Sequence, residues 1–257
     1  MQTAFRILSC LLLLLTLAGC AAAAPIAATP TPQPATLTPA AVPTLTPSPT
    51  AQALDTGPLT SEQRELLNQV AQSYIAETPE EAVEVAVRLG FLGDYGTADM
   101  VCGPLALAIL QGAGLVDSDI PLIDFFYLNP RPGQDDWRVK KVFPEETFEK
   151  IEIETRIDQI DYTEHPLYAG DFLYLFAGDS GSFDHMLVVS RVDESGRAYS
   201  VNNFPTADGY MIREVMLYDP NNPGTGQFYD WTDRKYMDIG RTGYGGFWLW
   251  RMKSPQN

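Results

Sequence analysis

Three kinds of residue along this chain have the chemistry and the order of a thiol-dependent catalytic site. Cys102 could act as a nucleophile, His185 as the base that takes its proton, and Asn202 or Asn203 as the group that orients the imidazole. A thiol nucleophile needs a base within hydrogen-bond reach, and the base needs an orienting partner. The reaction open to such a set is attack on a carbonyl carbon and hydrolysis of an amide bond.

The choice of base is narrow, because the whole chain contains only 2 histidines. His165 precedes Pro166 in a predicted loop, whereas His185 opens the predicted strand 185–192. At the start of a strand, His185 can face the N-terminus of a neighbouring helix. His185 is therefore the predicted general base, and His165 is the weaker alternative.

The two asparagines follow a predicted turn at 193–196 that folds the next strand back to the level of His185. Side chains alternate between the faces of a strand, so only one asparagine can face the imidazole. An odd number of loop residues selects Asn203, and an even number selects Asn202. At this point both remain open.

The segment 94–114 has to place the cysteine. Cys102 stands where a loop becomes a helix, because Pro104 fits only the first helical turn and Gly112 or Gly114 can end the helix. Residues 105–110 are apolar on every face, which predicts a helix buried inside a domain. The N-terminus of a helix stabilises negative charge, so we expect Cys102 to be an activated thiol rather than a passive core residue.

The remaining elements are predicted as helices first and strands second. Capping boxes at Thr60 and Thr78 predict two amphipathic helices, 120–128 predicts a short helix, 129–138 a loop and 144–151 one or two helical turns. Runs of β-branched and aromatic residues predict strands at 170–176, 185–192, 197–204, 210–218 and 246–252. This order predicts an α+β fold, with the Cys102 helix packed against an antiparallel sheet.

The N-terminal residues predict where the protein is located rather than how it folds. Residues 1–19 read as an export signal, because their apolar run is too short to span a bilayer, and Leu17-Ala18-Gly19-Cys20 resembles the lipobox of bacterial lipoproteins. The resemblance implies that Cys20 is lipidated and anchors the protein to a membrane on its extracytoplasmic face. Residues 20–58 are predicted to be this cysteine and a Thr/Pro-rich disordered tether, and 59–257 a single domain.

Cysteine usage and charge narrow the function further. Cys10 leaves with the signal and Cys20 carries lipid, so Cys102 is the only thiol expected in the mature domain, where an unpaired cysteine is more often functional. A net charge of −16 argues against nucleic acid and against an anionic membrane surface as partners. The lipid is then the only expected membrane contact. The acidity is compatible with a cationic peptide substrate, but it would also simply keep a secreted protein soluble.

No metal or cofactor is expected. One free cysteine and two histidines do not supply a zinc site. A calcium loop is matched at its first, third, sixth and twelfth places, by Asp219, Asn221, Gly224 and Asp230. Pro223 at the fifth place and the absence of predicted flanking helices favour a plain turn.

Taken together, these motifs resemble papain-like cysteine peptidases. The segments 102–108, 170–176, 185–189 and 201–203 are most similar to the bacterial branch that includes the double-glycine leader peptidases, with its motifs Cys-Gly-Pro-Ala, His-x-Val-Val and Val-Asn-Asp-Pro. The Gly-Asp strand before the histidine is also similar to NlpC-type cell-wall endopeptidases. The resemblance covers residues 96–205.

The resemblance implies a papain-like fold in which N-terminal helices pack on a C-terminal antiparallel sheet. It implies Cys102 as nucleophile, His185 as general base and Asn203 as the orienting residue, with Asn202 as the alternative. In the leader-peptidase branch a glutamine about six residues before the cysteine donates to the oxyanion. Gly96 stands at that position here. The donors would then be the Cys102 backbone N–H together with Thr97 or Tyr95.

Two functions are compatible with this resemblance. The first is a lipid-anchored hydrolase that cleaves an amide bond in a peptide or a cell-wall peptide. The second is a catalytically inactive surface module that binds a peptide or cell-wall glycopeptide, as the missing glutamine suggests. Aromatic residues at 231, 236, 244, 248 and 250 would suit such binding, although residues of this kind more often belong to the core and rim of a sheet.

Overall fold

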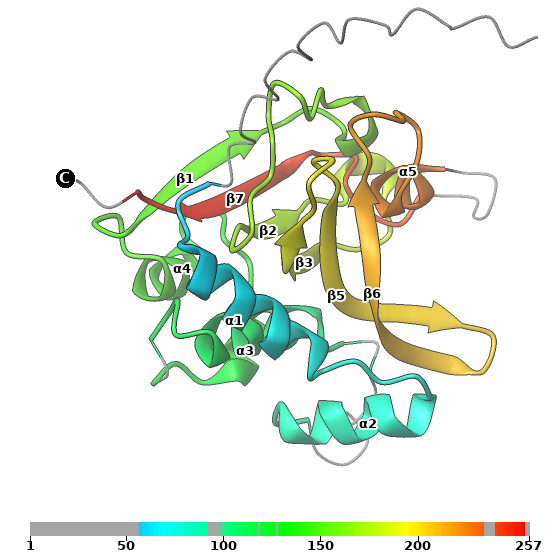
Figure 1. The fold of residues 1–257 in the computed structure, drawn as a ribbon. Coiled ribbons are helices and arrows are strands. Elements are labelled where there is room, and N and C mark those ends of the chain that lie inside the picture. Colours follow the sequence, from blue (N-terminus) through cyan, green and yellow to red (C-terminus); the bar gives the residue numbers. More distant parts are fainter. Residues whose placement is uncertain are drawn as a thin grey trace, which may run out of the picture. The chain divides into compact units, whose positions relative to one another are not determined.

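A computed structural model describes residues 57–91, 98, 100–117, 119–126, 128–233 and 240–254. The predicted signal, Cys20, nearly all of the predicted tether, and the segment with Tyr95, Gly96 and Thr97 lie outside the described residues. The described part of the chain has an α+β fold with antiparallel sheets (Figure 1). None of its helices is long and apolar enough to cross a membrane.

The larger helices precede the strands, apart from one short helix late in the chain. They are α1 (Ser61–Gln72), α2 (Pro79–Arg88), α3 (Cys102–Gly112), the 3-10 helix η2 (Leu122–Phe125), α4 (Asp136–Val142) and the later α5 (Gln227–Thr232). Thr60 and Thr78 form the predicted capping boxes with the residues three positions on, Gln63 and Glu81. The two predicted amphipathic helices are therefore confirmed.

The strands form two antiparallel sheets. The four-stranded sheet has the order β1 (Phe148–Ile153), β7 (Phe247–Met252), β2 (Phe172–Leu175) and β3 (His185–Val188), and the three-stranded sheet has the order β4 (Arg191–Val192), β5 (Ala198–Thr206) and β6 (Gly209–Tyr218). Short 3-10 helices, η3 (Ile157–Gln159) and η4 (Gly178–Ser180), lie in the connections. All five predicted strand regions contain strands, although 185–192 divides into β3 and β4, one in each sheet.

Two predictions for the middle of the chain are only partly right. The segment 144–151 does not become helical beyond a turn, because its second half enters β1 and pairs with β7, Phe148 lying opposite Met252. The predicted loop 129–138 ends early, since α4 begins at Asp136. In β1 the neighbouring strand supplies the hydrogen-bond partners, and this long-range pairing outweighs the local preference of the segment.

Buried apolar side chains divide into two clusters according to the faces of the central strands. The helix-side cluster contains residues 105–110 of α3 together with Phe172, Tyr174, Met186 and Val188. The α5-side cluster contains Leu173, Leu175, Leu187 and Val189 together with Phe228 and Trp231 of α5. Because the members alternate along β2 and β3, the two clusters lie on opposite faces of these strands.

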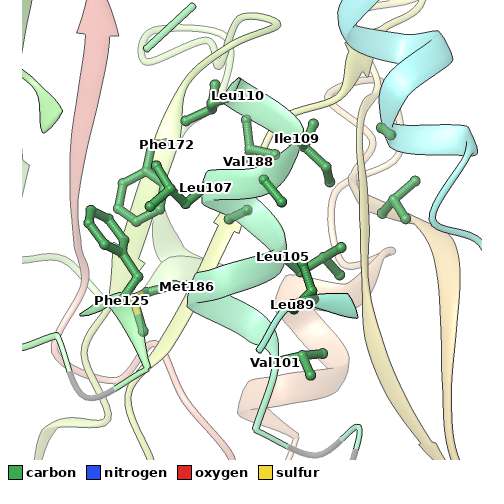
Figure 2. Packing of buried hydrophobic residues seen from close by; sticks show 14 of the residues in the cluster. Leu89, Val101, Leu105, Leu107, Ile109, Leu110, Phe125, Phe172, Met186 and Val188 are labelled. Atoms are coloured by element: carbon green, nitrogen blue, oxygen red, sulfur yellow. The ribbon is translucent and has the colours of Figure 1, made fainter. Parts of the chain in front are cut away.

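Helix α3 is buried on all sides, as predicted. Residues 103–110 are all buried, and Figure 2 shows Leu105, Leu107 and Leu110 of α3 beside Met186, Val188 and Phe172. A Cβ atom at Gly103 would collide with the carbonyl oxygen of Phe125 and with the Met186 side chain. The glycine after Cys102 therefore allows the first turn of α3 to lie very close to η2 and β3.

Candidate functional site

Cys102 is the first residue of α3 and faces the start of β3. Its side chain packs against the helix-side cluster, and it is the only free thiol among the described residues. Backbone N–H groups of Met186, Gly103 and Cys102 itself are directed at the sulfur, where they favour its ionised form. Helix and strand thus meet at the sulfur with several donors, an arrangement that can hold negative charge.

Burial nevertheless dominates the ionisation of this thiol. It raises the pKa of Cys102, and the N–H groups of Met186, Gly103 and Cys102 only partly oppose it. The residue as a whole is only partly buried, but the groups packed around the sulfur remove enough solvent to outweigh the expected activation by the helix start. In the free protein Cys102 is a neutral thiol at neutral pH.

His185 is the first residue of β3, but its side chain lies on the other face of the strand from α3. The imidazole packs edge-on against Trp231 of the α5-side cluster, with ring centroids 4.9 Å apart, and lies 6.1 Å from the ring of Phe183. Burial lowers the pKa of His185 to about 4, so the ring is neutral at pH 7. Its Nε2 atom has no hydrogen-bond partner among the described residues.

The turn after β4 contains an odd number of residues. The alternation of side chains between the two faces of the strand is, however, interrupted before this turn. Val192 pairs with Ala198, which leaves residues 193–197 in the turn. Val188 packs on the helix side. Arg191 also lies on the helix side, because its guanidinium binds Glu214, and Glu214 accepts a hydrogen bond from the Gln72 side chain of α1. Val188 and Arg191 are three positions apart. One extra residue is therefore inserted where the chain passes from one sheet to the other.

This insertion changes which asparagine faces the imidazole. Asn203 pairs with Ile212, which belongs to the helix-side cluster. Asn202 lies on the opposite face of β5, the face of Ala198 in the α5-side cluster. Asn202 therefore shares a face with the His185 side chain. An odd turn selects Asn203 only where side chains alternate without interruption from His185 to the turn, and here they do not.

The face that carries the imidazole also carries buried polar atoms without partners. His185 Nε2, Ser200 Oγ and both amide atoms of Asn202 have no hydrogen-bond partner among the described residues, and the three residues are only 4%, 0% and 2% exposed. Buried polar groups normally bind protein, water or ligand, and an unsatisfied one costs about 1–3 kcal/mol. Sequence reasoning missed Ser200, although its spacing of two residues from Asn202 on a predicted strand is a usable signal.

A second polar group that sequence reasoning missed lies on the Cys102 side. The Tyr174 hydroxyl and the Ala177 N–H each donate to the Asp184 carboxylate at 2.8 Å, and Arg131 Nη1 lies 3.5 Å from it. The pKa of Tyr174 is raised by burial, by the Asp184 carboxylate and also by Cys102. The phenol is therefore within electrostatic reach of the thiol. The only sequence signal was the position of Asp184 directly before His185.

The other candidates lie elsewhere or outside the described residues. His165 is exposed in a turn that its backbone N–H closes by donating to the Asp161 carbonyl at 2.9 Å. Thr97 and Tyr95, the candidate oxyanion donors, fall outside the described residues. Of the aromatic residues considered for binding, Trp231 and Trp250 are buried core residues, while Trp248 is half-buried beneath Lys150.

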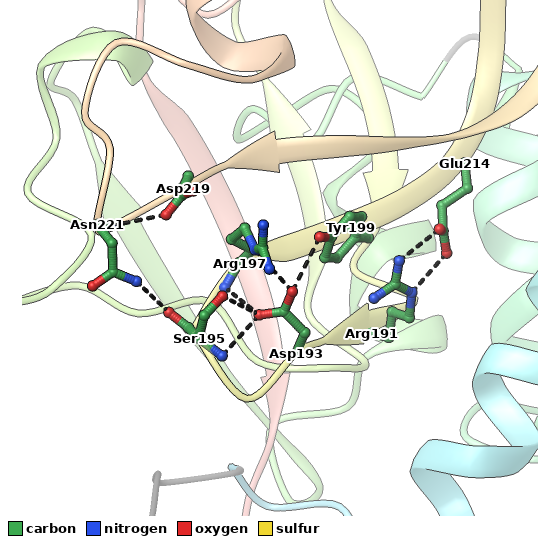
Figure 3. A network of polar contacts seen from close by, with 8 residues as sticks. All are labelled: Arg191, Asp193, Ser195, Arg197, Tyr199, Glu214, Asp219 and Asn221. Carbon is green, nitrogen blue, oxygen red and sulfur yellow. Dashed lines mark hydrogen bonds and ion pairs between the residues drawn. The ribbon is translucent and has the colours of Figure 1, made fainter. Parts of the chain in front are cut away.

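The segment considered for calcium is a turn that leads into α5. The Asp219 carboxylate accepts the Asn221 backbone N–H at 2.9 Å, and the Asn221 side chain donates to the Ser195 carbonyl at 2.7 Å (Figure 3). In the part of the chain that the structure describes, no group of three or more His, Cys, Asp or Glu side chains is placed to hold a metal ion.

No family model matches this chain, and no curated protein and no solved structure is significantly similar to it. The junction of α3 with β3 is therefore the basis for a proposed function.

Proposed function

We propose that the domain is a cysteine-dependent hydrolase of papain-like fold that cleaves an amide bond in a peptide. The proposal is supported above all by the contact between Cys102 at the start of α3 and the backbone of Met186, the residue after His185. The proposed nucleophile thus lies in α3 and the proposed base in β3, and these two elements meet at the Cys102 sulfur. A buried imidazole nitrogen without a partner among the described residues supports the role of His185 as the base.

In the proposed reaction the sulfur of Cys102 attacks the substrate carbonyl carbon while His185 takes the thiol proton. Backbone N–H groups at the sulfur stabilise the oxyanion. The imidazolium then protonates the leaving amine, and a water molecule, activated by the same histidine, hydrolyses the thioester. Asn202 accepts a hydrogen bond from the second ring nitrogen and orients the imidazole.

This mechanism starts from a neutral pair. Burial raises the pKa of the Cys102 thiol and lowers that of His185, so the free protein does not hold a thiolate and an imidazolium. The proton must move as the sulfur attacks. For this step the sulfur and the imidazole must come within hydrogen-bond reach of each other while the ring stays on the face of Asn202, a local rearrangement of the kind that accompanies ligand binding.

The proposed setting is the extracytoplasmic face of a membrane. A lipid on Cys20 would hold the domain there through the tether, and a peptide or a cell-wall peptide would be the substrate. The net charge of −16 disfavours nucleic acid as a partner.

Digestion of a mixture of short peptides and cell-wall peptides, followed by mass spectrometry, tests this function. We expect the wild type to release fragments and Cys102→Ala to lower turnover by at least about a thousandfold. The melting temperature should change by only a few degrees, since one sulfur is lost. His165→Ala is the matched control and should retain full activity. Unchanged cleavage by Cys102→Ala would refute the proposal.

A second function is favoured by a different observation, the position of the His185 imidazole on the face opposite α3. A papain-like module that binds a peptide or cell-wall glycopeptide without cleaving it needs no proton transfer between these residues. Equal binding of such a ligand by the wild type and Cys102→Ala, without any cleavage product, would favour this function.

A further inference from the structure

We infer that Asp184 and Tyr174 form a clamp that positions the first residues of β3, His185 and Met186, against Cys102. Asp184 is thus a positioning residue and not a catalytic one. The catalytic consequence of the clamp rests on the proposed function, whereas its effect on the position of His185 does not.

The carboxylate of Asp184 joins three separate segments of the chain. Its Oδ2 atom accepts from the Tyr174 hydroxyl of β2 at 2.8 Å, and its Oδ1 atom accepts from the Ala177 N–H, just after β2, at the same distance. Arg131, from the loop between η2 and α4, lies 3.5 Å from Oδ2 and also covers the ring of Phe176 at 4.6 Å. Both oxygens of the carboxylate are therefore engaged.

These contacts lie where the strand pairing ends. The last pair between β2 and β3 is Leu175 with His185, so Asp184 is the first residue beyond the ladder. In the same register Tyr174 lies opposite Met186, and its hydroxyl reaches back to Asp184. Tyr174 therefore pairs with Met186 through its backbone and binds Asp184, the residue before His185, through its hydroxyl. Its side chain is part of the buried helix-side cluster, which fixes the ring.

The clamp reaches the thiol through Tyr174. Tyr174 pairs with Met186 across β2 and β3, and the Met186 N–H is directed at the Cys102 sulfur. A loosened start of β3 would therefore displace that N–H and admit water to the imidazole beside Trp231. Such water would relieve the desolvation that now keeps His185 from taking a proton.

Titration of His185 by proton NMR of the full-length protein tests the clamp, because the chain has only 2 histidines and a His165→Gln variant assigns their signals. Asp184→Ala and Tyr174→Phe should each raise the His185 titration midpoint by at least about one pH unit towards its ordinary value. Asp184→Asn should stay near wild type, since its amide oxygen can still accept from Ala177 and its NH2 group can donate to the Tyr174 hydroxyl oxygen. Tyr199→Phe is the matched control.

This control removes the same kind of bond, from a tyrosine hydroxyl to an aspartate, in a different place. There the Tyr199 hydroxyl of β5 donates to Asp193, just after β4, at 3.1 Å (Figure 3). A purely structural loss would lower the melting temperature of both Tyr→Phe variants without moving the His185 midpoint. An unchanged midpoint in folded Asp184→Ala overturns the inference. If that variant does not fold, Tyr174→Phe decides by the same criterion. Absence of peptide cleavage by the wild type would contradict the proposed function and leave the titration result intact.

Discussion

The backbone N–H of Met186 is directed at the sulfur of Cys102, which brings the first turn of α3 and the first residues of β3 together at one thiol. His185 precedes Met186, yet its imidazole packs against Trp231 on the other face of the strand. Thiol reactivity and imidazole titration are therefore independent measurements of the same junction.

Alkylation of Cys102 by iodoacetamide should be slow at pH 7. Burial raises the pKa of this thiol, so the thiolate fraction, and with it the rate, should rise steadily with pH to beyond about 8.5, the ordinary value of a free cysteine. Peptide mapping by mass spectrometry at several pH values gives the rate at Cys102. A fast rate that is already constant between pH 6 and 7 would contradict this expectation and indicate a preformed ion pair.

The protein should lose stability in mild acid because of His185. Its pKa in the folded protein is about 4, below the ordinary value of about 6.5 in an unfolded chain, so the unfolded state takes up a proton first as the pH falls. Stability is retained above about pH 6.5 and decreases by up to about 3 kcal/mol between pH 6.5 and 4.

Urea unfolding at pH 7 and pH 4.5 measures this effect. His185→Gln should lose less stability between the two pH values than the wild type does, whereas His165→Gln, which changes an exposed histidine, should behave like the wild type. Equal losses in all three proteins would show that His185 does not titrate as its burial requires.

Alanine variants of the two asparagines should differ in activity. Asn202 shares the face of the His185 side chain and Asn203 does not, so Asn202→Ala should lower peptide turnover by about one to three orders of magnitude. Asn203→Ala should act mainly through stability. A strong defect confined to Asn203→Ala would restore the assignment based on unbroken alternation and on the family resemblance.

Cys20→Ala should release a folded domain from the membrane, because Cys20 and the domain are far apart in the sequence. Fractionation of cells into membrane and soluble parts, with detection of the domain in each, measures the release. A variant that stays with the membrane would rule out the lipobox assignment.

Local sequence signals were sufficient for much of the scaffold. The capping boxes at Thr60 and Thr78, the helix that begins at Cys102 and the β-rich runs from residue 170 onward are all present in the structure. These features depend on neighbouring residues: a hydroxyl three positions before a donor, a proline in a first turn, or β-branched residues in a short run. The order of elements then limited the fold to α+β.

Only the tertiary structure decided how the candidate residues face one another. The extra residue between Val188 and Arg191 reverses the alternation and places Asn202, not Asn203, on the face of the His185 side chain. A local pattern does not predict such an insertion, because it arises where the chain passes between two sheets. Burial likewise outweighs the helix start at Cys102. Desolvation depends on all the elements packed around the sulfur, which come from distant parts of the chain.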